Sequence, residues 1–246
     1  MTQALRTGPG AVLKQFFGVP FRRQTYRNIA YLALAFPLGL LYFVFLSVGL
    51  SVGVALVITV IGVPVLLVVL AVATGLATVE RKLTALLLGV DIAPPAESPL
   101  SPSADRTLVE RAKALVASVG TWKAVFYLAS KLALGVAAFV LITTLLVTAV
   151  TLLVVPFVYD QPGVYVGVVF EQPPTLHPAL AFGFDQLLVG VEAAVRLSSW
   201  EVSTLPEALA VALLGVGVGI AGLNLSNALA WLSGRYARFM LGGEAA

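Results

Sequence analysis

The chain has 246 residues, of which 59% are hydrophobic and only 11% are charged, and its mean hydropathy is +0.99. An average soluble domain is about a quarter charged, so this composition predicts an integral membrane protein. The absence of cysteine and the presence of a single histidine, His177, exclude a disulfide framework, thiolate catalysis and histidine-rich metal sites.

Residues 1–27 mix aromatic and cationic side chains and are predicted to form a cytoplasmic, interfacial N-terminus. Between Arg27 and Glu80 lie 52 residues without a charge. A helix needs about 20 apolar residues to span a membrane, so this stretch predicts two spans. We place them at 28–50 and 54–78, joined by a tight turn at 49–53.

Residues 93–120 are predicted to connect the two halves on the cytoplasmic side. The first part, 93–104, is rich in proline and serine and has no helical pattern. Thr107 and Glu110 then form a predicted capping box that opens a short helix reaching about Val119. Its expected apolar face, which should lie against the membrane interface, consists of Leu108, Ala112, Leu115 and Val119.

Two further apolar stretches, at about 131–159 and 207–235, complete the four predicted spans. Lys131 is the one charge at the border of the third span, and we expect its ammonium group to reach the nearby interface. With no acid, arginine or histidine inside a predicted span, the pattern argues against a proton pump or a voltage sensor.

The distribution of basic residues predicts the orientation. Of the 15 Lys and Arg residues, only Arg196 lies between spans three and four, and that segment carries six acids. Basic residues are retained on the cytoplasmic side. Both termini and the 80–123 loop are therefore predicted to be cytoplasmic, with 159–207 outside. The excess of arginine over lysine is typical of a high-GC prokaryotic coding sequence, so the predicted location is a prokaryotic cell membrane.

The two halves of the chain repeat each other. Thr25-Tyr26-Arg27 aligns with Thr121-Trp122-Lys123 at an offset of 96, and residues 61–63 align with 214–216 at an offset of 153. We therefore predict an all-α protein built from two tandem hairpin repeats, 28–92 and 121–246, which point the same way. The second repeat contains the outer insertion 159–207. A pseudo-two-fold axis along the membrane normal would relate them.

The outer insertion is predicted to contain an amphipathic helix from Pro178 to Ser199, lying on the outer leaflet or over the bundle. In that position it would act as a lid over the gap between the repeats. Polar side chains of the insertion form a candidate outer-face cluster, which either gathers around a ligand or cation or is simply solvated. Its members are Asp160, Glu171, His177, Asp185 and Glu192.

The fourth span carries the candidate intramembrane contacts. Gly215 and Gly219 form a GxxxG pair that allows close helix packing. The residues from Gly217 to Gly222 match GxGxxG, but inside an apolar span this spacing does not indicate a dinucleotide site. Asn224, Ser226 and Asn227 either join helices by hydrogen bonds or contact a ligand or ion.

Several short motifs, taken in order, resemble those of a known family. They are Phe36-Pro37-Leu38-Gly39, residues 59–64 (Thr-Val-Ile-Gly-Val-Pro), residues 86–90 (Leu-Leu-Leu-Gly-Val), and Trp122-Lys123 followed by Tyr127-Leu128. Over residues 15–242 the chain resembles the putative sensor domain family, found at the N-terminus of many actinobacterial sensor histidine kinases and as stand-alone proteins in haloarchaea.

The resemblance implies a four-helix membrane input module with no enzymatic activity and no cofactor, and it supplies no binding residues. Because eight residues follow Arg238, we expect signalling in trans to a kinase or to another signalling or transport protein, and no nucleic-acid partner. The alternatives are a small permease or channel subunit built from the duplicated hairpin, which could assemble as a homo-oligomer in the lipid bilayer, and a structural membrane scaffold.

Overall fold

The structure is a computed structural model, and the residues that it describes are 14, 16–94, 107–161, 165–166, 175–176, 179–184, 187–192, 195–196 and 200–243. They divide between two compact units. The first unit comprises residues 1–147 and 219–246, and the second comprises residues 148–218.

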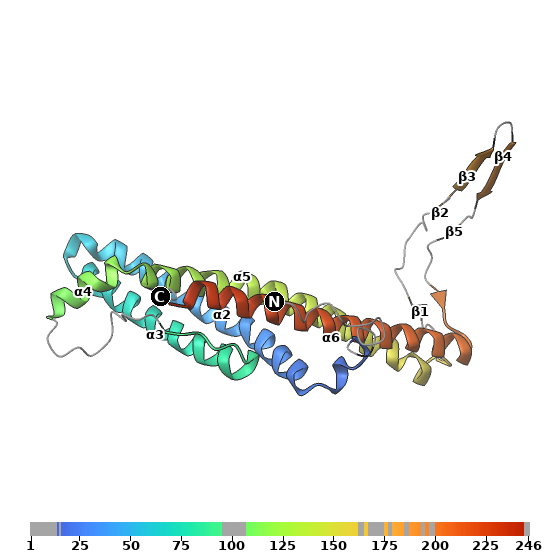
Figure 1. The fold of residues 1–246 in the computed structure, drawn as a ribbon, viewed down its shortest axis with the longest axis horizontal. Coiled ribbons are helices and arrows are strands. Elements are labelled where there is room, and N and C mark those ends of the chain that lie inside the picture. Colours follow the sequence, from blue (N-terminus) through green and yellow to red (C-terminus); the bar gives the residue numbers. More distant parts are fainter. Residues whose placement is uncertain are drawn as a thin grey trace, which may run out of the picture. The chain divides into compact units, whose positions relative to one another are not determined.

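Four long helices dominate the structure, α2 (Arg23–Ala55), α3 (Gly62–Leu88), α5 (Val119–Val154) and α6 (Leu205–Leu241) (Figure 1). All four are long and apolar enough to cross a membrane. At 1.5 Å per residue even α3, with 27 residues, is about 40 Å long, against a hydrocarbon thickness of about 30 Å. The predicted all-α membrane architecture with four spans is confirmed.

The helices bury little of their apolar surface within the chain. In the most apolar window of each helix, between 17% and 28% of the residues are buried inside the protein. The remaining side chains are predominantly apolar, so they need a hydrocarbon environment outside the protein. The four helices are therefore built to be surrounded by lipid.

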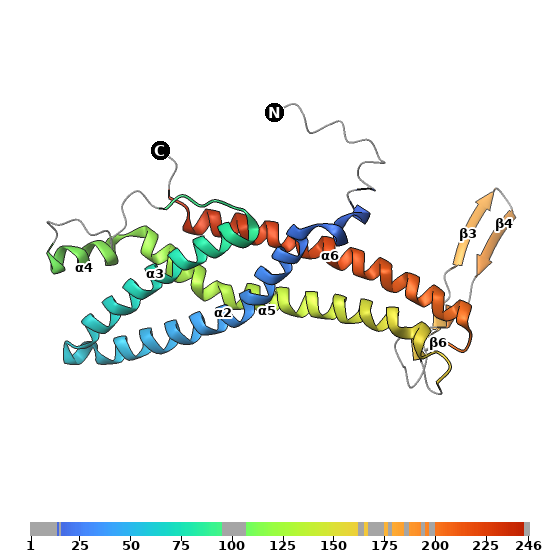
Figure 2. The ribbon, with the colours of Figure 1, turned by 90° about the horizontal axis from the view of Figure 1, so that it is seen from below.

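In the first unit, α2 and α3 form an antiparallel hairpin (Figure 2). The predicted turn at 49–53 is wrong, because Gly49 and Gly53 lie inside α2 and pack on α3. A Cβ at Gly49 would stand 2.7 Å from Cγ2 of Val69. These small residues allow the two helices to approach, and the chain turns later, through η2 (Leu56–Thr59).

Helices α2 and α5 cross in close contact, and the contact is reciprocal. A Cβ at Gly39 would lie 2.7 Å from Cα of Leu132, and a Cβ at Gly135 would lie 2.8 Å from Cα of Phe36. Gly135 and Leu132 follow Gly39 and Phe36 by the same 96 positions that relate the two halves of the sequence. At each glycine, the missing side chain therefore lets the backbone of the other helix approach, and the two contacts are at equivalent positions of the two halves.

The same reciprocity joins α3 to α6 within this unit. A Cβ at Gly234 would meet Cδ1 of Leu88 at 3.4 Å, and Arg81 Nη1 donates to the carbonyl oxygen of Leu241 at 3.4 Å. Arg81 and Leu88 precede Gly234 and Leu241 by 153 positions, the second sequence offset. Both pairs of contacts fit a pseudo-two-fold axis through the first unit.

The direction of the two repeats stays a prediction. Reciprocal contacts such as Gly39 on Leu132 and Gly135 on Phe36 arise from any two-fold axis, whichever way the two helices run. The tandem parallel arrangement of the hairpins is therefore not confirmed by these contacts.

Helix α4 (Leu108–Ala117) begins as the sequence predicts. The Thr107 hydroxyl accepts from the Glu110 backbone N–H at 3.3 Å, and the Glu110 carboxylate accepts from the Thr107 backbone N–H at 2.8 Å. This capping box is confirmed. Of the expected apolar face, Leu115 is buried, whereas Leu108 and Val119 are exposed.

The second unit contains the far ends of α5 and α6, η3 (Val155–Phe157) and the described strands. Its core consists of Val155, Val202, Ala208 and Val211. Strands β1 (Tyr165–Val166) and β6 (Trp200–Glu201) pair antiparallel, as do β2 (Thr175–Leu176) and β5 (Val195–Arg196).

The predicted outer helix at 178–199 is wrong over the described residues. Strands β3 (Ala179–Phe184) and β4 (Leu187–Glu192) pair antiparallel in its place, with Ala179 opposite Glu192. Gly183 and Gly190 each disfavour a helix by about 1 kcal/mol, whereas two phenylalanines in β3 and two valines in β4 favour strands. The lid hypothesis, which required that helix, is withdrawn.

Candidate functional site

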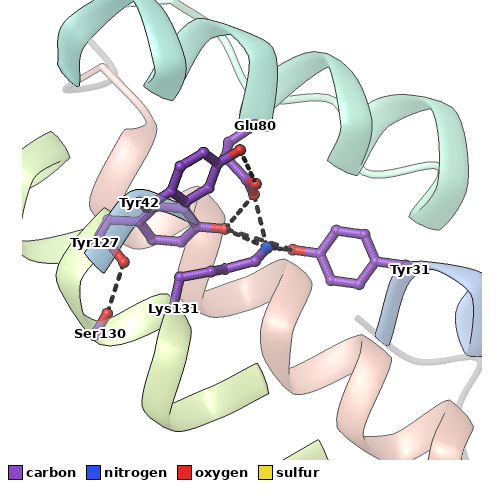
Figure 3. Close-up of polar contacts among 6 residues, drawn as sticks. All are labelled: Tyr31, Tyr42, Glu80, Tyr127, Ser130 and Lys131. Carbon is purple, nitrogen blue, oxygen red and sulfur yellow. Dashed lines mark hydrogen bonds and ion pairs between the residues drawn. The ribbon is translucent and has the colours of Figure 1, made fainter. Parts of the chain in front are cut away.

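A buried polar network lies where α2, α3 and α5 meet in the first unit (Figure 3). Its centre is an ion pair between Lys131 of α5 and Glu80 of α3, with 2.7 Å between Nζ and Oε2. The side chains of Lys131 and Glu80 are 5% and 0% exposed. Both charges are therefore withdrawn from solvent and depend on each other and on neighbouring hydroxyl groups.

Every carboxylate oxygen of Glu80 has a partner. Oε1 accepts from the Tyr42 hydroxyl at 3.0 Å. Oε2 accepts from the Tyr127 hydroxyl at 3.1 Å, in addition to the Lys131 ammonium. Hydrogen bonds to a charged group are roughly twice as strong as those between neutral groups. One carboxylate thus joins tyrosines and a lysine from two other helices.

The ammonium group of Lys131 is equally well satisfied. It donates to Glu80, to the Tyr31 hydroxyl at 3.0 Å and to the Tyr127 hydroxyl at 3.4 Å. It also lies 4.4 Å from the centre of the Tyr31 ring, within cation–π range. Its three N–H donors are all used, so it offers none to a substrate.

The local sequence of α3 places Glu80 on the buried face. Val69, Ala73, Ala77, Glu80 and Thr84 follow one another at spacings of three or four residues, and all five are buried. Residues at these spacings lie on one side of a helix. The small alanines let the neighbouring helices approach α3 closely, and Glu80 continues the same stripe.

A second group of polar contacts connects the network to α6. The Ser130 hydroxyl lies 2.6 Å from the Tyr236 hydroxyl and donates to the Tyr127 carbonyl at 2.9 Å. The rings of Tyr127 and Tyr236 stack with 5.5 Å between their centres. Tyr127 therefore contacts α3 through its hydroxyl group and α6 through its ring.

The ion pair occurs once although the chain is duplicated. By the two sequence offsets, the counterparts of Lys131 and Glu80 are Ala35 and Ser233. Ala35 and Ser233 line a small pocket that also borders Tyr31 and Lys131. This pocket has room for about one water molecule, which is too little for an organic ligand. The network is thus an asymmetric feature of a pseudo-symmetric core.

Chemically, the arrangement is suited to holding helices together and to resisting their separation. Removing one partner of a buried ion pair leaves an uncompensated charge, which costs about 3–5 kcal/mol. Any shift of α5 along α3 must stretch the 2.7 Å contact between Lys131 and Glu80. The network therefore couples the relative positions of α2, α3 and α5.

A family model described as Putative sensor matches residues 31–241. The chain belongs to this sensor family. The match covers most of the chain and includes every residue of the network from Tyr31 to Lys131. No curated protein and no solved structure matches the chain.

Two of the sensor's network residues were misjudged from the sequence. Lys131 was expected to reach the interface, but it is buried against Glu80. Glu80 is not predicted as a network residue, because in the sequence it only bounds an uncharged stretch. The signal that identifies it is the stripe of small residues on α3, since a carboxylate in line with Ala73 and Ala77 lies on the packed face.

Of the polar residues predicted in the fourth span, Asn227 joins α6 to α2, Asn224 joins α6 to the segment before α2, and Ser226 bonds within α6. Asn227 accepts from Asn28 Nδ2 at 2.8 Å and donates to the Thr25 hydroxyl at 3.1 Å. Asn224 donates to the carbonyl groups of Ile220 and Phe16 at 2.8 and 3.2 Å. Ser226 is buried and donates to the Gly222 carbonyl of its own helix at 2.8 Å. All three contact protein groups.

Gly215, the first glycine of the predicted pair, lies on the side of α6 that faces α5. A Cβ at Gly215 would stand 2.9 Å from Cβ of Leu152, and a Cβ at Gly222 would stand 3.2 Å from Cβ of Leu145. Gly219, between them, is half-buried. Gly222 was not part of the predicted pair, although it follows Gly219 at a spacing of three residues.

The candidate outer-face cluster is described only in part. Asp160 is exposed in the turn that follows η3, and Glu192 lies in β4. Glu171, His177 and Asp185 lie outside the described residues. Within the described part of the chain, no group of three or more His, Asp or Glu side chains is arranged to hold a metal ion.

Proposed function

We propose that the chain is a non-enzymatic sensor module of a membrane, which passes its signal to a separate partner protein. The observation that carries the proposal is the match of residues 31–241 to the Putative sensor family. The four apolar helices supply the membrane part of the module. Membership of a sensor family favours a regulatory role over catalysis.

The buried network supports this role because its polar groups are used within the protein. The carboxylate of Glu80 and the ammonium of Lys131 bind side chains from three helices. Such a network favours one arrangement of the helices, and a stimulus acts by favouring another arrangement. The stimulus would shift α5, and α4 would move with it because only Ser118 separates these helices.

The partner can be tested by isolating the full-length tagged chain from native membranes in mild detergent, with quantitative mass spectrometry. We expect at least one protein to be enriched reproducibly over a tagged four-span membrane protein that serves as control. We also expect its recovery to change when the network is altered by Glu80→Gln, because this substitution removes the charge while keeping the side-chain size.

Two results would contradict the proposal. Recovery of no reproducible partner would argue against signalling in trans. Flux of an ion or small solute into liposomes containing the purified chain, above that of empty liposomes, would favour a permease or channel. An unchanged partner recovery with Glu80→Gln would separate the partner from the network and leave the network with a purely structural role.

A further inference from the structure

In each half of the chain, a side-chain hydrogen bond of the same kind links the start of the first long helix to the segment before it. The Tyr26 hydroxyl donates to the carbonyl oxygen of Pro20 at 2.8 Å. In the second half, Trp122 Nε1 donates to the carbonyl oxygen of Val116 at 2.9 Å. In both halves the acceptor lies six residues before the donor, and the donors of the two hydrogen bonds are 96 positions apart in the sequence. An aromatic side chain thus fixes the segment that precedes each long helix.

The preceding segment of the second half, α4, exposes large apolar side chains. Leu108, Val109 and Val116 are 83%, 64% and 50% exposed. Successive residues of an α-helix are turned by about 100°, so these three side chains occupy one arc of α4. Arg111 and Lys113 stand at the two borders of this arc. Glu110, which forms the capping box, lies on the opposite side.

The corresponding segment of the first half has the same character. Phe16, Phe17 and Phe21 are 40%, 56% and 90% exposed. Lys14 and Arg22, at its two ends, are exposed cations. An apolar surface bordered by cations is typical of elements that lie in the plane of a membrane surface. Two segments of different sequence, each preceding the first long helix of its half, therefore show the same physical pattern.

The geometry points to anionic lipid as the occupant: we propose that α4 and its counterpart at residues 16–21 bind the headgroup region of an anionic bilayer. The apolar arc of α4 continues onto the lipid-facing surface of α5, where Val119, Trp122 and Phe126 are 69%, 51% and 61% exposed. Tryptophan is enriched at membrane interfaces. The bordering cations supply the charge that attracts anionic headgroups.

The proposal is tested with the full-length chain in nanodiscs of neutral phosphatidylcholine alone or mixed with anionic phosphatidylglycerol. Because the natural chain has no cysteine, a spin label can be placed on single variants Leu108→Cys and Val109→Cys. Ala117→Cys, on the opposite side of α4, is the matched control. Paramagnetic relaxation by oxygen and by a water-soluble nickel chelate then distinguishes lipid, water and protein surroundings.

In anionic nanodiscs we expect labels at 108 and 109 to be accessible to oxygen and protected from the nickel chelate, while the label at 117 is accessible to the chelate. Lys113→Gln should weaken the binding of α4 to the anionic surface relative to the neutral one, measured at the 108 label, by about fivefold, since one basic residue near an anionic surface contributes about 1 kcal/mol. The same substitution should leave the thermal stability of the chain unchanged.

Two outcomes would overturn the lipid assignment. Equal access of the nickel chelate to labels at 108, 109 and 117 would show that α4 lies in water. Protection of the 108 label from both oxygen and the chelate would show that protein covers the arc, either a second copy of the chain or another partner. Neither outcome bears on the sensor proposal, which rests on the family match and the buried network.

Discussion

The hydroxyl oxygens of Tyr31 and Tyr127 lie 3.5 Å apart, and the two residues are separated by the 96 positions that relate the halves of the chain. Two equivalent tyrosines thus meet near the pseudo-two-fold axis. Both contact the ammonium group of Lys131, whose own counterpart is Ala35. Two equivalent hydroxyl groups therefore contact a single ion pair. This ion pair makes the core asymmetric, although the duplicated sequence alone would give a symmetric core.

Replacing Lys131 with methionine should destabilise the chain strongly. The substitution keeps an apolar chain of similar length but leaves the Glu80 carboxylate buried without a counter-charge. The expected loss is about 3–5 kcal/mol in the free energy of unfolding, measured by thermal unfolding in detergent. The double variant Glu80→Gln/Lys131→Met should recover most of this loss, because both charges are then absent.

The exposed Lys113 provides the control for this comparison. Lys113→Met removes a charge of the same kind from the surface and should change stability by less than about 0.5 kcal/mol. If Lys131→Met behaved like Lys113→Met, or if the double variant were as unstable as the single one, the ion pair would not determine the stability of the core.

Substitution of the crossing glycines should be costly at both equivalent positions. A Cβ at Gly39 would lie 2.7 Å from backbone atoms of Leu132, and one at Gly135 would lie 2.5 Å from the Ala35 carbonyl oxygen. Because backbone cannot rotate away, Gly39→Ala and Gly135→Ala should each destabilise by about 1–3 kcal/mol. Equal losses at the two positions are expected from the reciprocal contact.

Gly75→Ala is the matched control, since nothing lies within 4 Å of a Cβ there. Alanine is favoured over glycine inside a helix by about 0.5–1 kcal/mol, so this variant should unfold at a higher temperature. A stabilising effect of Gly39→Ala would contradict the close crossing of α2 and α5.

Much of this architecture follows from the sequence, because membrane spans depend on long apolar stretches that a linear reading detects. The capping box at Thr107 could also be predicted, because its two residues are only three positions apart in the sequence. The ion pair was not predicted, since Glu80 and Lys131 are 51 residues apart in the sequence. A charged residue next to an apolar stretch is predicted to be interfacial, unless the pattern of small residues shows that it lies on the packed face of the helix.

The outer insertion shows the opposite error, where a local pattern was overinterpreted. A polar stripe at helical spacing suggested a helix, but Gly183 and Gly190 weaken a helix and the paired strands β3 and β4 accommodate both. Periodicity over a short apolar stretch does not separate helix from strand when glycine and β-branched residues are frequent.

Removing the Asn227 side chain should weaken the contact between α6 and α2. Asn227→Ala removes the bonds to Asn28 and Thr25. Interhelical hydrogen bonds in membranes contribute about 0.6 kcal/mol on average, so the expected loss is about 1 kcal/mol. In a double-mutant cycle with Asn28→Ala, the two substitutions should be less than additive. Fully additive losses would show that the two amides do not interact.

The orientation of the chain can be determined with an impermeant maleimide on intact cells and on inverted membrane vesicles. The distribution of basic residues predicts that Phe21→Cys and Ser103→Cys react from the cytoplasmic side and that Gln172→Cys reacts from outside. Labelling of Ser103→Cys and Gln172→Cys from one side would contradict a membrane-spanning α5. Labelling of Phe21→Cys and Ser103→Cys from opposite sides would mean that α2 and α5 cross the membrane in opposite directions, which would contradict two hairpins that point the same way. The charges favour the first result, in which α2 and α5 cross the membrane in the same direction.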